Sequence, residues 1–68
     1  MCTYKEELLN NLRNKRSHQL HILQDLERNL QKLSADEIEI KELLLKVQKK
    51  EIESLHAINH EINNLTNS

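Results

Sequence analysis

The 68-residue sequence contains no glycine and no proline, and it has neither phenylalanine nor tryptophan. Glycine and proline mark most turns, so a chain without them has few places at which to reverse direction. Tyr4 is the only aromatic residue. A β-fold needs repeated turns and draws on aromatic and β-branched residues, so this composition argues against one and favours long helices.

The chain also lacks an excess of charge of either sign and has no long apolar run. The chain has 10 basic and 11 acidic side chains, so no overall field favours nucleic acid or an anionic membrane. The longest aliphatic run, Leu43-Leu44-Leu45, is far too short to cross a bilayer. Cys2 is the only cysteine, and the N-terminus has no basic region followed by an apolar stretch. We therefore predict a cytoplasmic protein without a membrane span.

What remains is dominated by leucine, which occurs 13 times, and by Lys, Glu, Gln and Asn, most of which suit helices. One break lies mid-chain, where Ser34-Ala35-Asp36-Glu37 fits a capping box with a serine cap and a glutamate three positions later. We therefore predict a single domain over 1–68, with one helix from about 3 to 33 and a second from about 35 to 65. A single unbroken helix is the alternative.

Each predicted helix carries an apolar stripe with a spacing of three and four residues. In the first helix the stripe consists of Leu9, Leu12, Leu23, Leu26, Leu30 and Leu33, and it is widened by Tyr4, Leu8, Leu20 and Ile22. In the second helix it consists of Ile40, Leu44, Val47, Leu55, Ile58, Ile62 and Leu65. The same spacing places three polar residues within the stripes: Arg16, Gln19 and Glu51.

A fold-back at Ser34 makes these polar interruptions coincide. It pairs residues whose numbers sum to about 70, so Arg16 and Gln19 lie level with Glu51. We predict an Arg16–Glu51 or a Gln19–Glu51 contact that fixes the register of the hairpin more than it stabilises it. The predicted fold class is all-α, an antiparallel two-helix hairpin resembling a coiled coil. Its apolar levels are Leu30–Ile40, Leu26–Leu44, Leu23–Val47, Leu12–Ile58 and Leu9–Ile62.

Several apolar residues have no place in the seam of such a hairpin. Ile38, Leu45 and Ile52 repeat at heptad spacing, about 100° from the main stripe of the second helix. Leu8, Ile22 and Tyr4 form a similar surplus on the first helix. Isolated two-helix units of this size are marginally stable. We therefore predict that the surplus residues meet a protein partner or a second copy, which would complete a bundle of four helices, and that the interaction site consists of Leu8, Ile22, Ile38, Leu45 and Ile52.

The polar residues give little sign of other chemistry. His56 and His60 have the spacing that can hold a metal ion from one helix, but the hairpin sets them at a different level from His18 and His21. The pair also lacks the internal glutamate of a hydrolytic zinc helix. We therefore predict exposed histidines, no metal and no cofactor. With no phosphate-binding loop and no nucleophile beside a base, we expect the chain not to be an enzyme.

A short basic cluster, Arg13, Lys15 and Arg16, raises the alternative of a Rop-like dimer that binds RNA through its helix faces. The cluster has no stacking aromatic residue nearby, and acidic residues elsewhere offset its charge. We therefore predict that nucleic acid is not the partner, and we assign Arg16 to the seam of the hairpin.

The whole chain resembles the small subunit of type III secretion needle chaperones, the PscE/YscE/EscE group of short helical hairpins. The similarity lies in two long helices with a central break and in the aliphatic run Glu42-Leu43-Leu44-Leu45. The resemblance implies a co-chaperone that binds a helical-repeat chaperone and helps keep the needle subunit unpolymerised. It implies no catalytic or ligand residue. The alternatives are a homodimeric four-helix-bundle regulator of phage or plasmid type and the Rop-like RNA-binding dimer.

Overall fold

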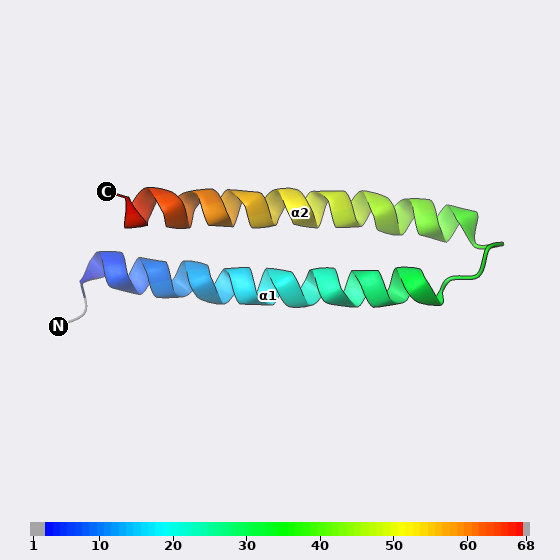
Figure 1. The fold of residues 1–68 in the computed structure, drawn as a ribbon, viewed down its shortest axis with the longest axis horizontal. Helices are drawn as coiled ribbons and strands as arrows, with labels where there is room; N and C mark the ends of the chain where they lie inside the picture. Colours follow the sequence, from blue (N-terminus) through cyan, green and yellow to red (C-terminus); the bar gives the residue numbers. More distant parts are fainter. Residues whose placement is uncertain (1–2, 68) are drawn as a thin grey trace.

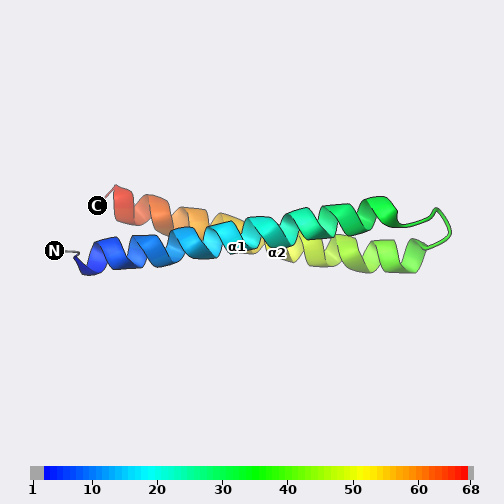
Figure 2. The ribbon, with the colours of Figure 1, turned by 90° about the horizontal axis from the view of Figure 1, so that it is seen from below.

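The computed structural model describes residues 3–67, which form two helices of 29 residues each, joined by a short turn (Figure 1). Helix α1 spans Tyr4–Lys32 and helix α2 spans Ile38–Thr66. The helices lie side by side and antiparallel in a rod of 55 × 17 × 12 Å, and Figure 2 shows that they cross at a shallow angle, as in coiled coils. Residues 3–67 contain no strand, and the predicted all-α hairpin is confirmed.

The first helix has well-defined ends. Its N-cap is Thr3, whose hydroxyl accepts a hydrogen bond of 3.2 Å from the backbone N–H of Glu6. Acidic side chains occupy the first turn and Lys32 lies in the last turn, which is the charge order that the helix dipole favours. The C-cap is Leu33. The predicted limits of 3 and 33 are thus the two capping residues of α1.

The turn differs from its prediction, because α2 begins at Ile38 and not at Ala35. The backbone N–H of Glu37 donates to the carbonyl of Ser34 at 3.1 Å, which closes a tight turn over 34–37. The Ser34 hydroxyl donates to the Glu37 carboxylate at 3.2 Å. The two residues of the expected capping box therefore meet, but they stabilise a turn. The actual N-cap, Glu37, makes no side-chain capping bond.

The register of the hairpin is set by a turn centred on residue 35. Lys32 and Ile38 lie at equal distances along the chain from that residue, and so do Tyr4 and Thr66. Since the helices are antiparallel and of equal length, residues whose numbers sum to about 70 lie at the same level. This level pairing was the one predicted, although the fold-back had been placed one residue earlier. The break at 33–37 excludes a single unbroken helix.

The core between the helices is thin. Among the described residues, only Leu12 and Ile62 are buried apolar side chains, at 4% and 7% exposure, and Gln19 is a buried polar one. Half-buried residues extend the seam at an unbroken spacing of three and four. On α1 and its C-cap these are Leu9, Arg16, Leu23, Leu26, Leu30 and Leu33; on α2 they are Leu44, Gln48, Glu51, Leu55, Ile58 and Leu65.

Two residues predicted for the α2 stripe lie outside this seam. Ile40 and Val47 are exposed, whereas Gln48 is half-buried. The physical reason is the heptad spacing, which leads from Glu51 back to Gln48 and Leu44 and leaves Val47 on the flank. Ile40 and Val47 are therefore not the seam partners that were predicted for Leu30 and Leu23.

Candidate protein-interaction surface

A polar layer crosses the middle of the hairpin seam. The side-chain amide of Gln19 donates to the carboxylate of Glu51 and also to its backbone carbonyl, the latter at 3.2 Å. Gln19 is only 8% exposed and Glu51 is half-buried. The predicted contact between Gln19 and Glu51 is therefore present. Arg16 instead donates to the side-chain oxygen of Asn59 at 3.5 Å, a partner that the sequence did not suggest.

This layer gives one register an advantage over its neighbours. Sliding α2 by one heptad would set Gln19 level with Leu44 or Ile58, neither of which has a side-chain acceptor. A buried amide left without a partner costs about 1–3 kcal/mol. In the observed register, no buried side-chain nitrogen or oxygen within residues 3–67 lacks a hydrogen bond. We infer that Gln19 and Glu51 act by penalising slipped pairings.

Exposed apolar side chains gather on the half of α2 nearest the turn. Among the described residues, eight large apolar side chains are exposed, and six of them lie between positions 38 and 52. These six are Ile38, Ile40, Leu43, Leu45, Val47 and Ile52. A single partner helix covers only one seam, so α1 cannot shield residues on both sides of it.

Five of the six exposed apolar residues of α2 form two groups, one on each side of the seam. Ile38, Leu45 and Ile52 repeat at heptad spacing with exposures of 61%, 45% and 40%; we call them the 38–45–52 line. The predicted exposure of these three residues is thus present in the structure. Ile40 and Val47 occupy the opposite flank. The prediction that Ile40 and Val47 belong to the core is therefore wrong, and the heptad spacing through Gln48 is the pattern in the sequence that places them on the flank.

The surplus predicted on α1 is smaller than expected. Leu8 and Ile22 are half-buried, because they lie beside the seam and are partly covered. Tyr4, which belongs to the predicted surplus, is 79% exposed, whereas Leu20, which is predicted to widen the stripe, is 44% exposed. The main uncovered apolar surface is therefore that of α2.

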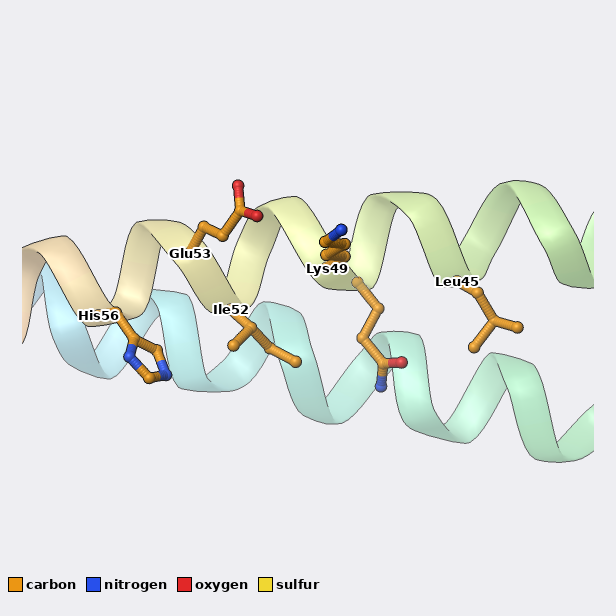
Figure 3. A pocket seen from close by; sticks show the side chains of 6 residues that line it. Leu45, Lys49, Ile52, Glu53 and His56 are labelled. Atoms are coloured by element: carbon orange, nitrogen blue, oxygen red, sulfur yellow. The ribbon is translucent and has the colours of Figure 1, made fainter.

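Two open hollows lie along the 38–45–52 line and share Leu45. Figure 3 shows the first, in which Ile52 and His56 point towards α1 while Glu53 points away from it. It is lined by Leu45, Gln48, Lys49, Ile52, Glu53 and His56. The second lies nearer the turn and is lined by Leu30, Leu33, Ser34, Ala35, Ile38, Lys41, Glu42 and Leu45. Leu45 is therefore the residue at which the two hollows meet.

The other candidate sites have a simpler geometry. His18, His21, His56 and His60 are all exposed. Within residues 3–67, no group of three or more His, Cys, Asp and Glu side chains could hold a metal ion. Cys2 lies outside the described residues. Neither α1 nor α2 has an apolar stretch long enough to cross a membrane.

The basic cluster is divided between the surface and the seam. Arg13 and Lys15 are exposed, whereas Arg16 is half-buried and is bound to Asn59. The three charges therefore do not form one outward-facing patch.

The chain matches no known protein family, and comparison with curated proteins and with solved structures also gives no match. The function of this surface must therefore be inferred from its geometry and chemistry.

Proposed function

We propose that the chain is a protein-interaction module, a helical hairpin that docks the exposed apolar residues of α2 against helices of a partner chain. The observation that carries this proposal is the contrast between the core and the surface. Two apolar side chains are buried between the helices, whereas six large ones are exposed on α2 alone. Contiguous exposed apolar residues mark surfaces that other proteins cover.

The energetics of a two-helix unit support the need for a partner. Full burial of a Leu or Ile side chain contributes about 2 kcal/mol, and most seam residues here are only half-buried. Isolated units of this size bury a smaller share of their surface than larger domains do and are marginally stable. Docking a further helix on α2 adds burial where the hairpin lacks it, without requiring a change in the seam.

The resemblance to needle chaperones supplies a specific form of this function. In that form the chain is a cytoplasmic co-chaperone subunit, without catalytic activity or cofactor, that binds a helical-repeat chaperone and keeps a type III secretion needle protein unpolymerised. The aliphatic run on which the resemblance rests includes two exposed residues, Leu43 at 63% and Leu45 at 45%. Their availability supports a role in docking.

A homodimeric four-helix bundle is a second candidate form. The observation that favours it is that the charged side chains and the hollow before Leu45 resemble, in reverse order, those after Leu45. A second α2 that runs in the opposite direction would therefore fit against the first. An RNA-binding dimer has less support, because Arg16 is engaged within the hairpin.

The general proposal is tested by the double variant Leu45→Glu/Ile52→Glu, with Ser54→Glu as a matched control at an exposed position of the same helix. Circular dichroism is followed over a dilution series. We expect wild type and control to gain thermal stability either with concentration or on addition of a partner chain, and the double variant to lose this gain. Wild-type chain that is monomeric, fully helical and cooperatively folded at every concentration would refute the proposal.

The co-chaperone form has its own assay. Light scattering follows polymerisation of a type III needle subunit in the presence of its helical-repeat chaperone, with and without this chain. We expect polymerisation to be delayed when the chain is added and not when the Leu45→Glu/Ile52→Glu variant is added. Equal polymerisation with and without the wild-type chain would overturn this form and leave the general proposal standing.

A further inference from the structure

Building on the function proposed above, we propose that the 38–45–52 line is covered by a second copy of the chain. In this dimer the two α2 helices run antiparallel, and a two-fold axis passes beside Leu45. Leu45 then meets its own counterpart, and Ile38 of each copy lies opposite Ile52 of the other.

The first argument is the symmetry of the two hollows. The hollow nearer the turn is lined by Ala35 of the turn and by Ile38, Lys41 and Glu42 of α2; the hollow on the other side of Leu45 is lined by Gln48, Lys49, Ile52, Glu53 and His56. Apart from Glu53, which has no counterpart and points away from α1 (Figure 3), the two sets lie at nearly the same distances before and after Leu45. Reversing a second α2 about this point therefore places Ile52 over the hollow that contains Ile38, and Ile38 over the hollow that contains Ile52.

The second argument is charge complementarity. Glu42 and Lys49 are seven residues apart, so they lie on the same flank of the 38–45–52 line. At a rise of about 1.5 Å per residue, Glu42 lies about 4.5 Å before Leu45 and Lys49 about 6 Å after it. In an antiparallel pair, equal flanks face each other. Each Glu42 is therefore brought within about 1.5 Å, along the helix axis, of the level of Lys49 in the other copy.

The opposite flank of the line brings no conflict to this arrangement. Lys41 and Gln48, also seven residues apart, occupy it on the side of the line nearer the seam, four residues before and three residues after Leu45. On this flank the dimer therefore sets each Lys41 opposite the neutral amide of Gln48 in the other copy. On the other flank it forms two oppositely charged pairs of Glu42 and Lys49. Apolar contact supplies the attraction, and the charges select the antiparallel register.

Cysteine cross-linking tests the position of the axis. In a Cys2→Ser background, mild oxidation of the Leu45→Cys variant should give a covalent dimer. Ile38→Cys alone should not, because its two copies lie about 21 Å apart along the axis. An equal mixture of Ile38→Cys and Ile52→Cys should give the mixed dimer, identified by mass. Cross-linking of Ile38→Cys to itself in preference to the mixed product would overturn the proposed axis.

Charge exchange tests the register independently. Sedimentation equilibrium should show that Glu42→Lys and Lys49→Glu each weaken the dimer about tenfold, since both pairs become repulsive. An equal mixture of the two variants should restore wild-type affinity, because every cross-pair is then attractive. Lys46→Glu is the matched control for Glu42→Lys, since it also creates a like-charge pair at positions 42 and 46, away from the line. It should change affinity by less than about threefold.

The outcomes separate this dimer from the function on which it rests. A dimer whose affinity is unaffected by the charge variants, and which lacks the predicted cross-links, overturns the proposed face. A chain that stays monomeric and unfolded until a different protein is added overturns the second copy as partner, while the interaction module stands. A chain that is monomeric and stably folded overturns both proposals.

Discussion

The buried amide of Gln19 gives the sharpest stability prediction. Its side chain is 8% exposed and donates to the carboxylate and the backbone carbonyl of Glu51. Hydrogen bonds to charged groups contribute about 1.5–3 kcal/mol. Since Glu51 is half-buried and its carboxylate can recover water, we expect Gln19→Ala to cost about 1.5 kcal/mol, near the lower limit of that range.

Thermal unfolding followed by circular dichroism measures this cost. For a domain of this size, about 1.5 kcal/mol corresponds to a fall in Tm of about 6–12 °C. All samples must be compared at one protein concentration, because association changes the apparent stability. Gln24→Ala is the matched control, since Gln24 is an exposed glutamine on the same helix. A Tm for Gln19→Ala that equals the Tm of Gln24→Ala would refute the stabilising role of the polar layer.

Three further predictions concern the seam and the cap. The double variant Gln19→Leu/Glu51→Leu should raise the Tm while allowing slipped registers, which would appear as duplicated amide signals in NMR spectra; a single set of signals would contradict the register role. Leu12→Ala should lower the free energy of unfolding, measured by chemical denaturation, by about 2–5 kcal/mol, whereas Leu43→Ala should lower it by less than about 0.5 kcal/mol in the chain alone. Equal losses for the two variants would contradict the burial pattern. Thr3→Ala should cost about 1 kcal/mol and speed hydrogen exchange in the first turn of α1; unchanged exchange there would contradict the cap.

Much of the fold follows from short-range patterns in the sequence. The absence of glycine and proline, together with the capping-box residues at 34–37, predicts two helices and the position of the turn. Once the turn is centred near residue 35, residues at equal distances from it along the chain lie at the same level. The contact between Gln19 and Glu51 follows from this pairing. The exposure of Ile38, Leu45 and Ile52 follows as well, because one partner helix cannot cover that side of α2.

Other features could not be predicted by counting apolar residues. Hydrophobicity favours Val47 over Gln48 for the seam, but the helix period through Glu51 and Leu55 places Gln48 there. The start of α2 moved to Ile38 because the carbonyl of Ser34 closes a tight turn with the N–H of Glu37. Packing geometry and backbone hydrogen bonding decided these positions, and neither is visible in residue type.

The contact between Arg16 and Asn59 shows a similar limit. Level pairing places Arg16 near Glu51, which predicts an ion pair. A long arginine side chain reaches along the helix beyond its own level, which is that of Ser54, and the structure directs it to Asn59, about 1.4 turns further along α2. Pairing by number therefore predicts the contact between Gln19 and Glu51 but misses the partner of the longer Arg16.

The claim that α2 must be covered by another helix is tested most directly by a dilution series of the wild-type chain, with mass from sedimentation and helix content from circular dichroism measured on the same samples. We predict that dimer mass and helix content fall together as the concentration is lowered. Helix content that stays constant through a range in which the mass is that of one chain would contradict the claim.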